Sequence, residues 1–175
     1  MLTNKNDAYY TGNVIASWAK RYIKYEEGPK LETDRQVVAR LGDAGFTTEL
    51  LLGKHGMVAD ESEDLGGHDF GPSPYQLLTS ALAACTSMTL QMYARRKKWP
   101  VDEVLCHVNY SKEYYEDCIA CVDEGAYLDT FDRSIEIKGD ITEEQRQRML
   151  EIANKCPVHR SLSSEIIVVT SLNEQ

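Results

Sequence analysis

The sequence predicts an α+β fold in which antiparallel strands surround one buried helix. The stretch from Gly71 to Trp99 is apolar around almost its whole circumference, which is typical of a helix enclosed by other elements. Runs of β-prone residues lie on both sides of it, in the order βββ–α–ββ–α–β, and do not alternate with helices as in a parallel doubly wound sheet. The length of 175 residues suits a domain with a sizeable core.

Residues 1–30 are interpreted as an N-terminal extension to a main domain over residues 31–175. Within the extension, weak helical periodicity over Val14–Tyr25 predicts a short helix that packs outside the main fold. Short turns between β-prone runs then predict an antiparallel meander. Its expected strands are Gln36–Leu41, Phe46–Leu52 and Met57–Glu61.

Clear start and stop signals frame the central helix. Ser73 supplies a capping hydroxyl, Pro74 suits the first helical position, and a basic run over Arg95–Lys98 precedes Pro100. We explain Gly66 and Gly67 in the preceding loop by flexibility. One sheet cannot cover a helix that is apolar on all sides, whereas a second copy of the helix could. The sequence therefore predicts an intertwined homodimer with its central helices packed together.

The rest of the chain continues with two long strands and two helices. Thr142 and Gln145 form a capping box at the start of the first of these helices. On one expected strand, Phe131, Ile135 and Ile137 share a face that alternates with polar residues. The expected elements are strands Glu103–Tyr115 and Phe131–Lys138, helices Thr142–Lys155 and Pro157–Leu162, and a last strand Ile166–Thr170.

Composition narrows the classes of partner and compartment. With 19 basic and 28 acidic residues the formal charge is −9, which disfavours nucleic acid and anionic membranes as partners. The chain begins without a signal-peptide pattern, and no run reaches the roughly 18 apolar residues of a membrane span. We therefore expect a cytoplasmic protein. Five cysteines, an odd number, then favour redox chemistry, metal binding or plain core thiols over a disulfide framework.

Two cysteines are candidates for a reactive thiol. Cys85 lies within the apolar helix, where an unpaired cysteine is often a small core residue and where burial raises a thiol pKa. Cys156 precedes Pro157, so it lies near the positive end of a short helix, with His159 and Arg160 close in sequence. It could equally end the preceding helix against the core.

The other cysteines carry weaker signals. Cys118 and Cys121 form a single C-x-x-C, which could be half of a zinc site completed by His107 or a second subunit, a redox pair, or two loop thiols without a role. Cys106 lies in an expected strand and reads as a core residue. Because no zinc-protease, nucleotide-binding or serine-hydrolase motif occurs, we expect no metal and no cofactor.

Together, two cysteine contexts resemble those of a known family. A proline-led helix ending in A-L-A-A-C-T-S-M is followed about seventy residues later by K-C-P-V-H-R-S-L. This order resembles the OsmC/Ohr family of osmotically inducible and organic hydroperoxide resistance proteins, over roughly Asp34 to Leu172, and within it a less characterised OsmC-like branch. The resemblance implies an OsmC-like fold and an interlocked homodimer with its active site at the dimer interface.

The resemblance also implies a thiol-dependent peroxidase with an antioxidant role. Cys85 matches the cysteine that attacks an organic hydroperoxide, and Cys156 matches the cysteine that closes a disulfide, which a dithiol reductant then opens. Members carry a glutamate where this chain has Tyr75, so Tyr75, His159 and Arg160 are the expected supporting residues.

Residues Leu82, Met88 and Tyr75 are expected to line the substrate pocket. Alternative hypotheses are a redox-sensing or small-ligand-binding dimer without catalysis, and a metal-binding role at the C-x-x-C.

Overall fold

The structure is a computed structural model that describes residues 4–22, 30–43, 45–114 and 127–172. The chain divides into two compact units. One unit comprises residues 1–40 and 49–57, and the other comprises residues 41–48 and 58–175. No helix among the described residues is both long and apolar enough to cross a bilayer.

Helix α1 spans Lys5–Ala19, so the predicted bounds Val14–Tyr25 are wrong. The helix begins after Asn4, whose side chain accepts the N–H of Asn6 at 2.9 Å. An N-terminal cap of this kind satisfies a backbone donor that has no partner within the helix. The start therefore depends on one polar side chain, which the apolar periodicity could not locate.

A three-stranded sheet has the order β1–β2–β3, as the meander predicts. The strands are β1 (Val37–Leu41), β2 (Thr48–Leu52) and β3 (His55–Ala59). Strand β3 begins at His55 and not at Met57, because the turn before it uses only Gly53 and Lys54. Gly53 has φ +60°, a left-handed conformation that glycine adopts without steric cost and that suits a two-residue hairpin turn.

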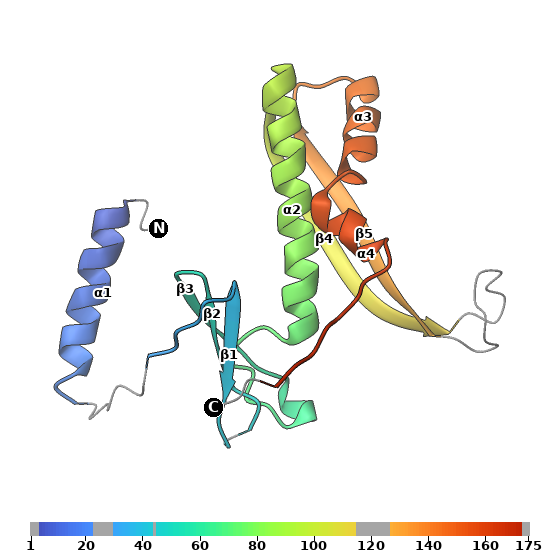
Figure 1. The fold of residues 1–175 in the computed structure, drawn as a ribbon. Coiled ribbons are helices and arrows are strands. Elements are labelled where there is room, and N and C mark those ends of the chain that lie inside the picture. Colours follow the sequence, from blue (N-terminus) through green and yellow to red (C-terminus); the bar gives the residue numbers. More distant parts are fainter. Residues whose placement is uncertain (1–3, 23–29, 44, 115–126, 173–175) are drawn as a thin grey trace. The chain divides into compact units, whose positions relative to one another are not determined.

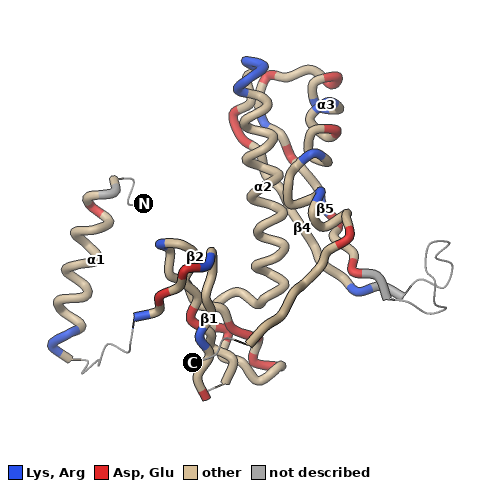
Figure 2. Tube along the Cα trace, viewed as in Figure 1, with Lys and Arg blue, Asp and Glu red and all other residues tan. Residues whose placement is uncertain are grey.

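Helix α2 (Pro74–Lys97) begins as the sequence predicts. Ser73 and Gln76 form a reciprocal capping box, and Pro74 occupies the first turn. The basic residues of the last turn lie at the C-terminal end of the helix, where the dipole favours positive charge (Figure 2). The helix ends at Lys97, within the basic run that the sequence places before Pro100, and Lys98 turns the chain out of the helix with φ +56°.

Helix α2 packs against a long antiparallel hairpin, and two C-terminal helices pack against α2 (Figure 1). The hairpin consists of β4 (Val101–Tyr114) and β5 (Tyr127–Gly139), paired so that Cys106 lies opposite Ile135. Helix α3 (Glu143–Ala153) starts with the predicted capping box, and α4 (Pro157–Leu162) has the predicted bounds. Both strands of the hairpin begin or end beyond the predicted limits.

The core of this unit joins the C-terminal half of α2 to α3 and the hairpin. Leu90 and Met149 are completely buried at its centre. The remaining buried members are Tyr93, Ala94, Val101, Ile141, Ile152 and Ala153. In the single chain α2 buries one face only, since Met88 and Met92 are 65% and 71% exposed. Burial of the whole circumference depends on a second chain and stays a prediction.

The loop before α2 is anchored by a buried carboxylate. Asp60 accepts the Thr47 hydroxyl at 2.9 Å and the backbone N–H groups of Glu61, His68 and Phe70 at 2.8–3.4 Å. A Cβ on Gly67 would lie 1.9 Å from the Glu61 carbonyl oxygen. Explaining this glycine by flexibility is therefore wrong: the anchored loop requires a residue without a side chain.

The predicted strand Ile166–Thr170 is absent from the described residues. Its apolar members are exposed, from 60% at Ile166 to 88% at Val169. A strand needs a neighbour that accepts its backbone hydrogen bonds, and no described strand of this chain pairs with the segment. The β-branched residues thus favour a strand, but the segment does not form one in the single chain.

Two consecutive residues of α3 give a test of the core. Met149→Ala should lower the free energy of unfolding by about 2–5 kcal/mol, because the side chain is completely buried and its removal leaves a cavity. Leu150→Ala, at a position that is 44% exposed, should cost less than about 1 kcal/mol. Urea unfolding measures both values, and equal costs would contradict the packing described.

Candidate functional site: a thiol cluster between α2 and α4

Two thiols that are distant in the sequence form a hydrogen-bonded pair. Cys85 lies on α2 and is half-buried, whereas Cys156 is completely buried at the junction of α3 and α4. Their side chains lie close enough for each thiol to shift the pKa of the other through hydrogen bonding. The pair exists because α4 packs against α2, and α3 ends just before Cys156.

The N-terminus of α4 favours negative charge on Cys156. Burial by itself raises the pKa of this thiol, but donated hydrogen bonds outweigh burial and lower the pKa below its ordinary value. The donors are the thiol of Cys85, the backbone N–H of His159, the hydroxyl of Thr86 and the backbone N–H of Val158. Cys156 is the cap residue of α4, and Pro157 provides its first turn.

Cys85 holds the proton of the pair. Burial raises its pKa, and its hydrogen bond to Cys156 raises it further, because a thiolate on Cys156 both accepts that proton and repels a second negative charge. The backbone N–H of Val158 and the hydroxyl of Thr89 oppose this effect without reversing it. At rest the partly exposed sulfur is therefore a thiol, and the buried sulfur is the more acidic of the two.

The cation beside the pair is Arg133 of β5, which the sequence analysis missed. Its guanidinium donates to the Thr86 hydroxyl oxygen at 3.0 Å, the Ala153 carbonyl at 3.3 Å and the Asn154 side chain at 2.9 Å. A signal was present: Arg133 has the strand phase of Phe131, Ile135 and Ile137, so alternation places it on the inner face. A charged residue in that phase is unusual enough to indicate a role.

A third thiol, Cys106 on β4, borders the same hydroxyl. Burial raises its pKa, while the charge of Arg133 and a hydrogen bond from Thr86 lower it in part. Cys106 is half-buried, in line with its interpretation as a core residue. That interpretation did not include its polar neighbours, Thr86 and Arg133. Three cysteines from α2, β4 and the α3–α4 junction surround Thr86, which is itself completely buried.

A cavity of about 350 Å³ adjoins this cluster. Two residues of its lining act on the thiol cluster. Arg133 donates to the Thr86 hydroxyl oxygen, and the backbone N–H of His159 donates to Cys156. Neither cysteine lines the cavity itself. The other lining residues are Leu82, Asp129, Phe131, Leu162 and Ser163. Of the three residues expected to line a substrate pocket, Leu82 lines this cavity, whereas Tyr75 and the exposed Met88 do not.

The three predicted supporting residues have different surroundings. His159 acts on Cys156 through its backbone N–H, and burial together with Arg133 lowers the pKa of its ring, which keeps the ring neutral. Arg160 is exposed and lines a separate open pocket. Tyr75 stacks on Tyr110 with ring centroids 4.1 Å apart, and the Tyr110 hydroxyl donates to Asp129 at 2.6 Å.

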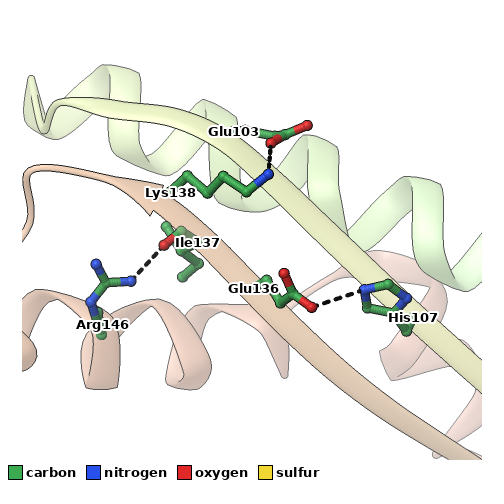
Figure 3. Close-up of polar contacts among 6 residues, drawn as sticks. All are labelled: Glu103, His107, Glu136, Ile137, Lys138 and Arg146. Atoms are coloured by element: carbon green, nitrogen blue, oxygen red, sulfur yellow. Dashed lines mark hydrogen bonds and ion pairs between the residues drawn. The ribbon is translucent and has the colours of Figure 1, made fainter.

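Cys118 and Cys121 lie outside the described residues, so the structure does not place the proposed C-x-x-C site. His107, their suggested partner, faces Glu136 across the hairpin, with Nε2 and a carboxylate oxygen 3.5 Å apart (Figure 3). Among the residues that the structure describes, no three histidine, cysteine or acidic side chains gather as a metal would require.

A protein-family model matches the part of the chain that contains the thiol pair. A model described as "OsmC-like protein" matches residues 66–171, which is more than half of the chain and includes both paired cysteines. The chain belongs to the OsmC-like family. No match is found among curated protein sequences. The family match covers α2, the β4–β5 hairpin, α3 and α4, which are the elements that build the thiol cluster.

Solved structures share the fold of this OsmC-like protein. An OsmC-like protein from Mycoplasma pneumoniae is 18% identical, with a TM-score of 0.59 over 76% of this chain and 89% of that one. An organic hydroperoxide resistance protein from Legionella pneumophila is 18% identical, with a TM-score of 0.53 over 75% and 91%. One from Elizabethkingia anophelis is 19% identical, with a TM-score of 0.54 over 76% and 89%. At these identities the likeness establishes the fold.

The position of the shared proton can be tested by alkylation of Cys85. Because the hydrogen bond to Cys156 and the charge on that residue raise the Cys85 pKa, Cys156→Ala should move the pH midpoint of Cys85 alkylation downward. Peptide mass spectrometry isolates Cys85 from the other four cysteines. An upward movement would mean that Cys85 carries the thiolate and Cys156 the proton.

Proposed function

We propose that this OsmC-like protein is a thiol-dependent peroxidase that reduces organic hydroperoxides to alcohols. The observation that carries the proposal is that the Cys85 and Cys156 thiols lie next to each other, with Cys85 partly exposed and Cys156 completely buried. One sulfur can meet a substrate while the other waits within reach for the oxidised product. Such a division of roles is what disulfide-forming reduction of a peroxide requires.

In the first step, the Cys85 sulfur attacks the terminal oxygen of the hydroperoxide and the O–O bond breaks. The peroxide oxygen and its hydrogen stay on Cys85 as a sulfenic acid, and the alkoxide leaves. The Cys85 proton crosses the existing hydrogen bond to the Cys156 thiolate as the sulfur attacks, and it is then delivered to the alkoxide to give the alcohol. Cys156 is thereby returned to its thiolate form.

In the second step, the Cys156 thiolate attacks the sulfur of the sulfenic acid and displaces hydroxide, which takes a proton from solvent and becomes water. The Cys85–Cys156 disulfide that results is the oxidised form of the pair, which has given two electrons to the peroxide. A dithiol reductant then opens it by two exchange reactions, which regenerate both thiols and oxidise the reductant to its own disulfide.

The substrate class follows from the cavity beside the cluster. Leu82, Phe131 and Leu162 offer apolar contacts for an alkyl or aryl group, which hydrogen peroxide lacks. Some structural relatives are described as organic hydroperoxide resistance proteins, which agrees with this class of substrate. We therefore propose organic hydroperoxides in preference to hydrogen peroxide.

Turnover with cumene hydroperoxide and a dithiol tests the activity. The wild-type protein should consume peroxide catalytically, and Cys85→Ser should abolish consumption. Cys156→Ser should react once and then accumulate a Cys85 sulfenic acid, which a dimedone adduct detects by mass spectrometry. Cys106→Ser, within the same cluster, serves as the matched control and should keep turning over. Undiminished turnover in Cys85→Ser would exclude the mechanism.

One observation favours a second candidate, a redox-sensing or ligand-binding dimer without turnover. The raised pKa of Cys85 leaves its sulfur protonated at neutral pH unless the proton moves to Cys156. If that transfer is not coupled to attack, Cys85 would be oxidised slowly and stoichiometrically. Disulfide formation without catalytic turnover in the experiment above would select this candidate.

We also propose that the protein works as a homodimer. Apolar side chains spaced three or four residues apart form an exposed stripe along α2, comprising Leu78, Ala81, Ala84, Met88 and Met92. Regular spacing of this kind suits helix-to-helix packing, and the small side chains allow close approach. A second copy would also offer the exposed Ile166–Val169 run a strand to pair with.

Ala84→Glu tests the dimer. Burying an unpaired carboxylate at a helix contact costs about 3 kcal/mol or more, so dimer dissociation should become at least about a hundredfold easier. Sedimentation equilibrium measures the change. Gln147→Glu on the exposed side of α3 adds the same charge away from the stripe and should leave the association unchanged. A monomeric wild-type protein would end the proposal.

A further inference from the structure

The guanidinium of Arg133 connects the two parts of the chain that supply the thiol pair. It reaches from β5 to Thr86, the residue after Cys85, and to Asn154, two positions before Cys156. A third bond goes to the Ala153 carbonyl, at the end of α3. All three acceptors are fixed by helices, and Thr86 is completely buried. The Thr86 hydroxyl oxygen is therefore held by Arg133 on the side that faces β5.

The direction of the hydrogen bonds follows from the chemistry of the two groups. A guanidinium has donors only, so the Thr86 oxygen must accept from Arg133. The hydroxyl has a single proton, which is then left for another acceptor. The acceptors beside it are the sulfurs of Cys156 and Cys106. The arginine thus turns a freely rotating hydroxyl into a donor directed at sulfur.

The charges around Cys156 identify Arg133 as the group that directs the Thr86 hydroxyl proton toward sulfur. Cys85 from α2 and the backbone of His159 from α4 act on Cys156 directly, and Cys106 from β4 interacts with it through charge. Arg133 from β5 acts on two of these neighbours, Cys106 and His159. The two other thiols carry their protons, and the His159 ring is neutral. Among these neighbours Arg133 alone keeps a positive charge throughout the physiological pH range.

We propose that Arg133 is a positioning residue that acts through Thr86: its guanidinium occupies the Thr86 oxygen and so aims the hydroxyl proton at the Cys156 sulfur. The donated proton favours the thiolate form of Cys156. This inference rests on the proposed function for its catalytic meaning. Held in this form, Cys156 accepts the Cys85 proton during attack on the peroxide and afterwards attacks the sulfenic acid. Without Arg133, the charge on Cys156 would lose both its oriented donor and its nearby cation.

Titration of the reduced protein tests the inference without any peroxide. Thiolate absorbance in the ultraviolet is followed against pH, and the step that disappears in Cys156→Ala is assigned to Cys156. Arg133→Met should raise the pH of this step by about one unit, since loss of a nearby opposite charge commonly shifts a pKa by that much. Thr86→Val, which has the same shape, should raise it in the same direction and carries the test if Arg133→Met does not fold.

Matched controls separate charge orientation from mere packing. Arg146 on α3 also bonds to β5, through the Ile137 carbonyl at 2.5 Å, but in a different part of the hairpin (Figure 3). Arg146→Met should leave the Cys156 step unchanged. Thr79 lies on α2 like Thr86, but its hydroxyl donates to the Gln76 carbonyl of its own helix, so Thr79→Val should also have no effect.

A double-mutant cycle tests whether Arg133 acts through Thr86. In the Thr86→Val background, Arg133→Met should shift the Cys156 step by less than about half of its effect in the wild-type protein, because coupled residues are not additive. A full shift in that background, a wild-type titration in Arg133→Met, or an equal shift in Arg146→Met would each overturn the inference.

Peroxide turnover provides the second readout. Arg133→Met should consume cumene hydroperoxide about tenfold more slowly at neutral pH and recover as the pH is raised by about one unit, a recovery that a structural defect would not give. If the wild-type protein shows no turnover, the proposed function fails, while the titration still decides the role of Arg133.

Discussion

The contact of α3 and α4 with α2 is the constraint on which the site depends. Cys85 and Cys156 are far apart in the chain, and only this packing brings their sulfurs together. The core around Leu90 and Met149 holds the contact, because both side chains are completely buried between the helices. The hairpin completes it, with Arg133 of β5 bonded to α2 and to the end of α3. The chemistry of the cluster therefore rests on apolar packing next to it.

Burial and donated hydrogen bonds have opposite effects on the thiol pKa values of the cluster. Which effect is larger differs from one cysteine to the next. Burial raises the pKa of Cys85 and Cys106, which accordingly remain protonated. Cys156 is the most deeply buried of the three, yet its pKa is lowered, because it receives two backbone donors from the start of α4 as well as the Cys85 thiol and the Thr86 hydroxyl. Each of the other thiols receives fewer donors. A buried anion is stable when several donors replace its lost water. The geometry of donors thus decides which sulfur carries charge.

The surface of the single chain exposes apolar side chains in two places. Apolar side chains remain exposed along α2 and over Ile166–Val169, although the rest of α2 packs well. Exposed apolar stripes of this regularity are typical of surfaces that a partner covers. The proposed homodimer would explain both features together. It would also place the partly exposed Cys85 close to the seam between the copies, since Ala84 and Met88 lie beside it on α2.

The sequence by itself determined the local structure. Caps and turns act over three or four residues, so Ser73, Pro74 and Thr142 located helix starts correctly. β-prone composition located the first hairpin strand and alternation the second, but neither located the strand ends. It also singled out Cys85 and Cys156 as candidates. The tertiary structure decided what local patterns do not contain: the lack of a partner strand for Ile166–Thr170 among the described residues, and the direction in which each thiol pKa is shifted. Arg133 illustrates the difference, because its strand phase was readable, but its bonds to Thr86 and Asn154 join residues that only folding brings together.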